Sequence, residues 1–158
     1  MKYIILYLLS QLYFCIITIY SALYKLKIFK AVNFSVPVLA VGNISMGGAG
    51  KTPMVITVSK LLRSLQIKHG IISRGYGRVS KKNVVVSNEN TVLSNVYSAG
   101  DEPFLLATGL PSVPVLVGKK FKSIFTAYRS FNAQTILLDD SFQTQNIEKN
   151  LDIVLIDV

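Results

Sequence analysis

The segment 38–52 constrains the fold most strongly, because an apolar run there leads directly into a glycine-rich turn. It reads VLAVGNISMGGAGKT. This order predicts a buried strand, a phosphate-binding loop and the start of a helix. Glycines let main-chain N–H groups surround phosphate oxygens, and the beginning of a helix adds partial positive charge. The residues predicted to bind a nucleotide are Ser45, Met46, Gly47, Gly48, Ala49, Gly50, Lys51 and Thr52.

The last two residues of this segment have separate predicted roles. Lys51 would reach the outer phosphates, and the Thr52 hydroxyl would bind Mg²⁺. The usual spacing of such a loop has a glycine five positions before Gly50, where this chain has Ser45. The alternative interpretation is a strand-to-helix turn that contains Gly-Lys-Thr by chance.

Length and charge limit the function classes. The chain has 158 residues, enough for one domain with a real core, and a net charge of +9, which favours anionic partners. The basic residues are scattered and form no stripe with aromatic residues, so we expect no nucleic-acid partner. The single cysteine, Cys15, excludes an internal disulfide and a cysteine-based metal cluster.

The N-terminal region is strongly apolar. No charged residue occurs from Tyr3 to Tyr24, and Lys25, Lys27 and Lys30 come directly after it. A helix over this run is about 33 Å long, enough to span a bilayer core, and the lysines predict a cytoplasmic location for the remainder of the chain. They would also attract anionic lipids. The alternatives are a helix lying in the interface, a buried helix and a cleaved signal peptide. We therefore predict a membrane anchor over 1–30 and a nucleotide-binding domain over 31–158.

The rest of the chain alternates between strand and helix patterns. This alternation predicts an α/β fold with a P-loop NTPase-like, mostly parallel sheet flanked by helices. The polar segment 88–99 is predicted to be a loop. Strands are expected at 38–41, 69–73, 82–87, 113–117, 135–138 and 153–156, and helices from the Gly-Lys-Thr segment to about 66, at 101–109 and at 119–131.

Carboxylates follow one strand and begin one helix. Asp139 and Asp140 come directly after the strand 135–138, at the edge where α/β sheets bind ligands. They could hold Mg²⁺, directly or through water, or be a solvated pair. Asp101 begins a helix in the sequence Gly-Asp-Glu-Pro. It could accept a proton from an attacking hydroxyl, or it could cap the helix. The residues alone leave both alternatives open.

A second turn at the same edge is basic. Arg74 and Arg78 lie in the sequence SRGYGR, after the strand 69–73, and could contact phosphate oxygens or form a basic surface turn. His69 is the only histidine. We expect it to be a surface residue or one with its hydrogen bonds satisfied, because catalysis would need a partner that the sequence does not reveal.

Taken together, these segments resemble the tetraacyldisaccharide 4′-kinases, the lipid A kinases of Gram-negative bacteria. The resemblance lies in residues 37–53, 72–78, 100–103 and 137–143, in the same order and with similar spacing. The family has Ser or Thr at the position of Ser45, and it also has an apolar N-terminal helix. The resemblance therefore implies a location at the inner membrane, on its cytoplasmic face.

The resemblance also implies a reaction and roles for residues. The family transfers the γ-phosphate of ATP, with Mg²⁺, to the 4′-hydroxyl of a lipid disaccharide, tetraacyldisaccharide 1-phosphate. By this resemblance the catalytic residues are Lys51, Asp101, Asp139 and Asp140. Metal binding falls to Thr52 and Asp139, and substrate binding to Arg74, Arg78, Glu102 and Gln143.

The chain departs from the family pattern at three points. Ser141 stands where the family has glycine, and Thr144 stands where it has histidine. The resemblance covers only about the first half of a family member, so a second lobe, with a histidine thought to pair with the base, is expected to be absent or separately encoded. The chain is then either a lipid A 4′-kinase portion or an inactive relative that only binds nucleotide. A different membrane-tethered nucleotide-binding protein is the third hypothesis.

Overall fold

The computed structural model describes residues 2–44 and 50–156. The chain divides into two compact units. The first contains Met1–Asn33 and Thr144–Glu148, and the second contains Phe34–Gln143 and Lys149–Val158. The predicted nucleotide-binding residues 45–49 lie outside the described part of the chain.

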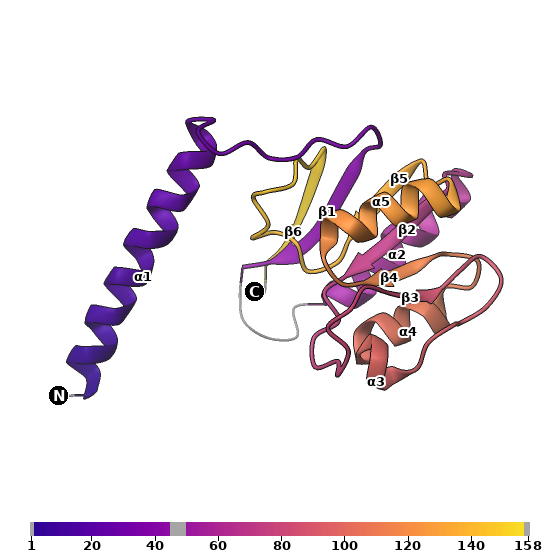
Figure 1. Ribbon diagram of the computed structural model, residues 1–158, viewed down its shortest axis with the longest axis horizontal. Coiled ribbons are helices and arrows are strands. Elements are labelled where there is room, and N and C mark those ends of the chain that lie inside the picture. The colour runs from indigo at the N-terminus through magenta and orange to yellow at the C-terminus, as the bar shows by residue number, and fades with distance from the viewer. Residues whose placement is uncertain (1, 45–49, 157–158) are drawn as a thin grey trace. The chain divides into compact units, whose positions relative to one another are not determined.

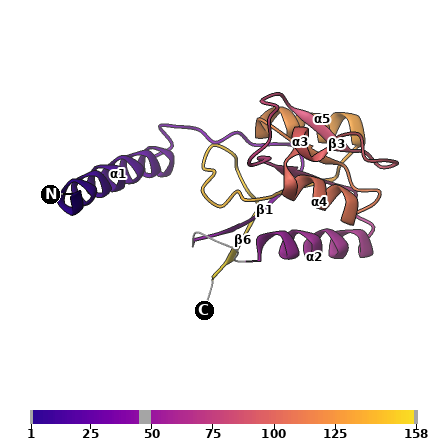
Figure 2. The ribbon, with the colours of Figure 1, turned by 90° about the horizontal axis from the view of Figure 1, so that it is seen from below.

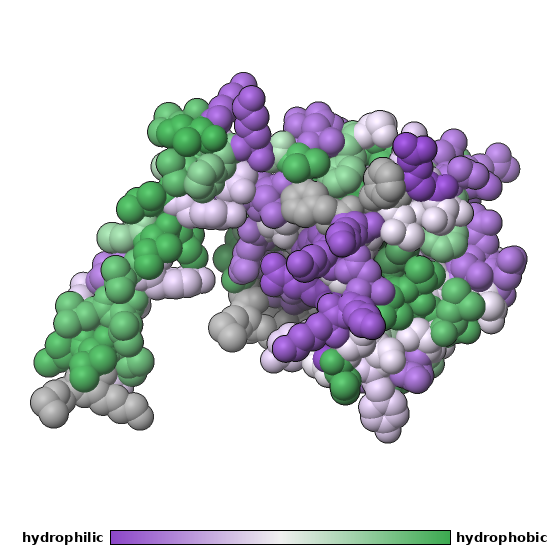
Figure 3. All heavy atoms as spheres, viewed as in Figure 1, coloured by the Kyte–Doolittle hydropathy of each residue, from purple (hydrophilic) through white to green (hydrophobic). Residues whose placement is uncertain are grey.

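The first unit is dominated by one exposed apolar helix, α1 (Lys2–Lys25). Its segment Tyr3–Lys25 is long and apolar enough to cross a membrane, with a mean hydropathy of 1.8 and none of it buried. Figure 3 shows mostly hydrophobic side chains on its surface. This exposure argues against the alternative of a buried core helix.

Helix α1 ends in a defined turn. Lys27 adopts a left-handed conformation (φ 58°). The Ile28 N–H donates to the Leu23 carbonyl at 3.0 Å, and the Lys27 N–H donates to the Tyr24 carbonyl at 3.0 Å. These two bonds form a Schellman motif, which satisfies the last carbonyls of the helix. The aromatic rings of Tyr20, Tyr24 and Phe29 contact one another at this end of α1.

The second unit contains a six-stranded sheet in the order β3-β4-β2-β5-β1-β6, shown in Figure 1. Among the described strands, only the β3–β4 pair is antiparallel. The predicted α/β class with a mostly parallel sheet is thus confirmed. The strands are β1 (Val38–Asn43), β2 (His69–Ser73), β3 (Val84–Ser87), β4 (Val115–Val117), β5 (Thr135–Leu138) and β6 (Leu151–Leu155).

Helices cover the sheet on two sides, as Figure 2 shows for α2 and α5. Helix α2 (Lys51–Ser64) packs against β1 and against α4 (Asp101–Gly109), whereas α5 (Lys120–Phe131) packs against β2 and β4. Coverage on both sides explains why β2, β4 and β5 are buried along their whole length.

The predicted loop 88–99 contains a short helix, α3 (Val96–Ala99). Asn95 caps it, because its side-chain oxygen accepts a hydrogen bond from the Ser98 N–H at 3.0 Å. Polar residues such as Asn occur both in loops and at helix caps, so composition alone did not separate the two. The strand predicted at 153–156 is also shifted, since β6 spans Leu151–Leu155.

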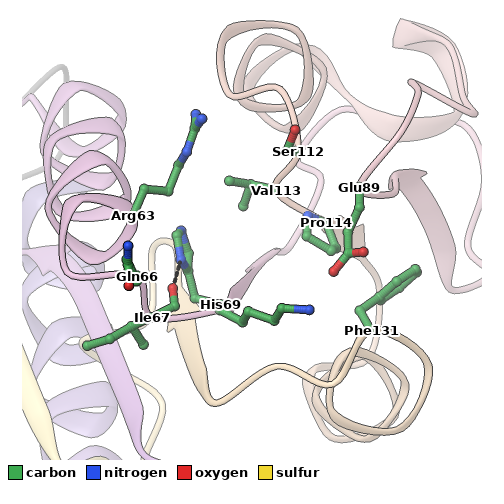
Figure 4. A pocket seen from close by; sticks show the side chains of 10 residues that line it. Arg63, Gln66, Ile67, His69, Glu89, Ser112, Val113, Pro114 and Phe131 are labelled. Carbon is green, nitrogen blue, oxygen red and sulfur yellow. Dashed lines mark hydrogen bonds between the residues drawn. The ribbon is translucent and has the colours of Figure 1, made fainter.

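His69 lies at the start of β2 and is 5% exposed. Its Nδ1 lies 3.1 Å from the Ile67 carbonyl, drawn as a dashed line in Figure 4. Because a carbonyl can only accept, Nδ1 carries the proton and Nε2 accepts from the Ser59 hydroxyl at 2.7 Å. Both ring nitrogens are therefore satisfied, which confirms that prediction.

This environment predicts a pH dependence of stability. Burial lowers the pKa of His69, the Ile67 carbonyl opposes this, and Arg63 lowers the pKa further. The unfolded chain therefore takes up a proton at a higher pH than the folded chain. The contribution of His69 to stability is present above about pH 6.5 and is lost as the pH falls below that value, by at most about 1.4 kcal/mol per pH unit.

Urea unfolding of the full chain in detergent, followed between pH 7.5 and pH 5 (roughly the titration window of histidine), measures this slope. A His69→Gln variant should be less stable at neutral pH but show a flatter slope. An unchanged slope in that variant would assign the acid sensitivity to other groups.

Candidate active site

The carboxyl ends of β1, β2 and β5 meet at one edge of the sheet because these strands are neighbours in the order β2-β5-β1. Asn43 ends β1, and Asp140 follows β5 closely. Lys51, the first residue of α2, connects the two. Its Nζ donates to the Asn43 Oδ1 at 3.0 Å and lies 3.9 Å from the Asp140 Oδ1. This is the edge where parallel α/β sheets bind their ligands.

A cavity of about 340 Å³ opens at this edge. It is lined by five predicted site residues, which come from two helix starts and two strand ends that are distant in sequence. Two further lining residues were not predicted as site residues. The full lining is Lys51, Ser73, Arg74, Tyr76, Asp101, Glu102 and Asp140.

The two adjacent carboxylates differ in exposure. The Asp140 side chain is 49% exposed and faces the cavity, whereas Asp139 is 1% exposed. The Ser73 hydroxyl donates to the Asp139 Oδ2 at 2.8 Å. Burial raises the pKa of Asp139 to about 6; the Ser73 bond opposes this, and the carboxylates of Glu102 and Asp140 add to it. Asp140 is therefore the carboxylate that a ligand in the cavity would meet first.

The turn that carries these carboxylates is tightly held. Asp140 adopts a left-handed conformation (φ 48°), which non-glycine residues seldom do. The Ser141 N–H donates to the Val41 carbonyl at 3.1 Å, and the Ser141 hydroxyl donates to the Asp139 carbonyl at 2.9 Å. In this turn the residue with the positive φ is therefore Asp140 and not Ser141. The serine in place of the family's glycine adds a hydrogen bond through its side chain.

Lys120 is a residue of this site that the sequence analysis missed. Its Nζ donates to the Asp140 carbonyl at 3.3 Å and also to the Ser141 hydroxyl. Burial lowers its pKa to about 8; Arg74 lowers it further, and the carboxylates of Asp140 and Asp139 oppose this. Lys120 closely follows β4, a neighbour of β2, so the strand order would have revealed it.

Asp101 is the first residue of α4, and Gly100 (φ 91°) occupies the N-cap position before it. The alternative that Asp101 caps this helix is therefore wrong. Its carboxylate instead lies in the first turn, where the partial positive charge of the helix favours an ionised acid. This placement leaves the carboxylate exposed in the lining of the cavity.

Besides the buried Asp139, four predicted site residues among the described ones do not line this cavity: Gly50, Thr52, Arg78 and Gln143. The Arg78 Nη1 donates to the Lys82 carbonyl. Thr52 is half-buried in the first turn of α2, next to Lys51. Gly50, before α2, has a φ of 74°, which is a conformation that favours glycine.

A second cavity, of about 200 Å³, lies at the opposite edge of the sheet and is shown in Figure 4. Its lining includes the cations Arg63 and Lys68 and the carboxylate of Glu89. Among the described residues, none that was predicted to bind ligand lines it. The buried, neutral His69 lies at its base, so its charged groups are the two cations and Glu89.

Comparison with known proteins shows the family to which the chain is related. Residues 2–158 match the family described as tetraacyldisaccharide-1-P 4′-kinase. The tetraacyldisaccharide 4′-kinase of Desulfotalea psychrophila is 42% identical over 94% of this chain and 43% of its own length. That of Halothermothrix orenii is 40% identical over 97% of this chain and 40% of its own length.

A solved structure is also similar. The crystal structure of LpxK from Aquifex aeolicus in complex with ATP has a TM-score of 0.89 and 35% identity, covering 98% of this chain and 49% of that one. The chain spans less than half the length of the curated relatives named above. With the family match extending over nearly all of its residues, this chain belongs to the tetraacyldisaccharide 4′-kinase family.

Proposed function

We propose that this chain carries the nucleotide-binding part of an ATP-dependent kinase that phosphorylates the 4′-hydroxyl of tetraacyldisaccharide 1-phosphate in lipid A biosynthesis. One observation carries the proposal: Lys51, Asp101 and Asp140 line a single cavity although they lie on separate elements. A cation, an exposed carboxylate in a helix N-terminal turn and a second carboxylate are the groups that phosphoryl transfer requires. Family membership and the ATP-bound relative support the same reaction.

The nucleotide would bind with its phosphates at the start of α2. Lys51 would neutralise their charge, and the partial positive charge of the α2 N-terminus would add to it. Arg74, exposed in the cavity lining, would contact phosphate or acceptor oxygens. Lys120 would keep Asp140 in place through the Asp140 carbonyl.

The residues at this edge fit Mg²⁺. The Thr52 hydroxyl and the Asp140 carboxylate are hard oxygen ligands, which Mg²⁺ prefers. Asp139, the predicted metal ligand, is buried and accepts a hydrogen bond from Ser73. It would therefore contact the ion through water, or help to position Asp140. The described residues contain no group of three His, Cys, Asp or Glu side chains placed to hold a metal, so nucleotide phosphates would complete the set. The bound ion would supply neutralisation of phosphate charge.

Asp101 is proposed as the general base. Its exposed carboxylate would accept the proton of the 4′-hydroxyl as that oxygen attacks the γ-phosphate. Glu102 lies beside it in the same lining and would orient the acceptor. Sequence present in the longer relatives, whether on this polypeptide or another, would complete the enclosure of the acceptor.

The exposed apolar helix α1 is proposed as an anchor in the inner membrane, with the second unit on the cytoplasmic side. Its length suits a membrane span, and Lys25, Lys27 and Lys30 lie at its C-terminal end. Each lysine near an anionic lipid surface contributes about 1 kcal/mol of attraction. Such an anchor suits an acceptor whose acyl chains remain in the bilayer.

The Asp101→Asn variant tests the proposed reaction. The full chain is incubated with radiolabelled ATP, Mg²⁺ and the disaccharide lipid, and 4′-phosphate formation is measured. Loss of the base should lower the rate at least about 100-fold, while the affinity for ATP stays within about twofold, because asparagine keeps the shape but cannot take the proton.

The matched control is Glu89→Gln, which neutralises an exposed carboxylate at the opposite edge of the sheet and should leave the rate unchanged. A wild-type rate in Asp101→Asn would refute its role as the base. Nucleotide binding without any transfer by the unsubstituted chain would favour the alternative of a relative that only binds nucleotide.

A further inference from the structure

Two segments beside the cavity pack closely against each other and form one border. The Val79 N–H donates to the Tyr97 carbonyl at 2.9 Å. A Cβ atom at Gly75 would lie 2.6 Å from the Ala99 carbonyl oxygen, and one at Gly100 would lie 2.8 Å from the Tyr76 carbonyl oxygen. The turn 74–82 and the segment 95–100, which includes α3, are therefore in backbone contact.

The side chains on this border are unusually exposed for their type. Tyr76 is 92% exposed, Val79 is 79% exposed and Tyr97 is 78% exposed, and Lys81 and Lys82 are exposed beside them. We call these five residues the rim. Because Tyr76 also lines the cavity, the rim lies at the mouth of the candidate active site.

The charge of the rim has one sign. Between residues 74 and 97 the basic residues are Arg74, Arg78, Lys81 and Lys82, and the single acidic residue is Glu89. Glu89 lines the cavity at the opposite edge of the sheet. Of the two arginines, Arg78 is held within the turn by its bond to the Lys82 carbonyl. Within residues 74–97 the exposed lysines therefore have no acidic neighbour on the rim, and the carboxylates that follow the border, Asp101 and Glu102, line the cavity.

We propose that the rim docks onto an anionic lipid surface. Tyrosine side chains suit the head-group level of a bilayer, because the ring is apolar and the hydroxyl can remain hydrated. Lysines at that level pair with lipid phosphates while their methylene stems cover apolar surface. An exposed apolar cluster bordered by cations thus matches an anionic membrane better than it matches water.

Docking would bring the mouth of the cavity to the lipid head groups. An acceptor that keeps its acyl chains in the bilayer could then present its sugar to Asp101 and Lys51 without leaving the membrane. This consequence rests on the proposed function, but docking itself does not require phosphate transfer. A failure of one is therefore distinguishable from a failure of the other.

The chain has no tryptophan, so a single introduced tryptophan reports on one place. Tyr97→Trp marks the rim, and Tyr128→Trp on α5, where Tyr128 is 39% exposed, is the matched control. Full-length chain is reconstituted into vesicles of brominated phosphatidylcholine, with or without brominated phosphatidylglycerol, so that both kinds of vesicle carry the same bromine quencher of tryptophan. We expect a blue shift and at least about twofold quenching for Trp at position 97 in the anionic vesicles only.

Neutralising the lysines (Lys81→Gln with Lys82→Gln) should reverse most of that quenching, although α1 still holds the chain on the vesicle. Val79→Trp is a second reporter in case Tyr97→Trp fails to fold, as judged by circular dichroism. Equal quenching at positions 97 and 128, or equal quenching with and without phosphatidylglycerol, would overturn the proposal. A concentration-dependent blue shift without vesicles would instead indicate a protein partner and would also overturn it.

Discussion

Replacing Lys51 by alanine should weaken the binding of Mg·ATP to this chain by about 100-fold. The Lys51 ammonium lies between the Asn43 amide and the Asp140 carboxylate, at the start of α2 and in the lining of the cavity. A charged hydrogen bond to a ligand contributes about 1.5–3 kcal/mol, and about 2.7 kcal/mol corresponds to 100-fold in affinity. Removing it also leaves Asp140 facing the incoming phosphates without its neighbouring cation.

Isothermal titration calorimetry of the full chain in detergent measures this effect. The matched control is Lys60→Ala, which removes an exposed lysine from the same helix and should leave the affinity unchanged. The two variants lose the same charge, so a general loss of attraction for anions would affect both equally. Equal weakening in both would show that Lys51 has no specific contact with the nucleotide, and the candidate site would then be incorrect.

Replacing Gly42 by alanine should destabilise the second unit by about 3 kcal/mol, the upper part of the range for overpacking a core. Gly42 lies in β1, and a Cβ atom there would lie 2.5 Å from the Phe142 Cβ and 2.8 Å from the Phe142 N. Strand and turn must separate to admit it. Because the Ser141 N–H bonds to the neighbouring Val41 carbonyl, this separation would also displace Asp140 and weaken Mg·ATP binding.

Thermal unfolding measures the loss, which should lower the midpoint by about 6–12 °C for a chain of this size. The matched control is Gly109→Ala at the end of α4, where an added Cβ has open space around it. That substitution should stabilise the chain by up to about 1 kcal/mol, because alanine is the better helix former. Similar midpoints for the two variants would mean that the turn 139–142 can move away from Gly42 without a loss of stability.

Much of the fold could be predicted because its signals are local. The continuous apolar run at 38–41 indicated a strand covered on both faces, and the strands predicted at 69–73 and 135–138 have those bounds in the structure. The Gly-Lys-Thr segment correctly predicted the beginning of α2 at Lys51. Misplacements occurred where a signal has two meanings, as at Asn95, which reads as a loop residue but caps α3.

The candidate site was predictable in part for the same reason. Residues that directly follow parallel strands must lie at the carboxyl edge of the sheet, so Arg74, Asp139 and Asp140 were placed there from the sequence. Lys120 was missed because its position depends on β4 being next to β2. Arg78 was expected at a ligand, but its guanidinium bonds to the Lys82 carbonyl within its own turn.

The sequence by itself determined the strands, the helix that begins at Lys51, the exposed apolar helix α1 and the edge at which the acidic and basic residues gather. These follow from hydrophobic periodicity and from glycine, which act over a few residues. Only the tertiary structure decided that Asp140 faces the cavity and that Ser73 bonds to the buried Asp139. It also decided that Lys120 bonds to the turn that carries both aspartates. Those outcomes depend on which strands become neighbours, and strand order is set by packing between segments far apart in the chain.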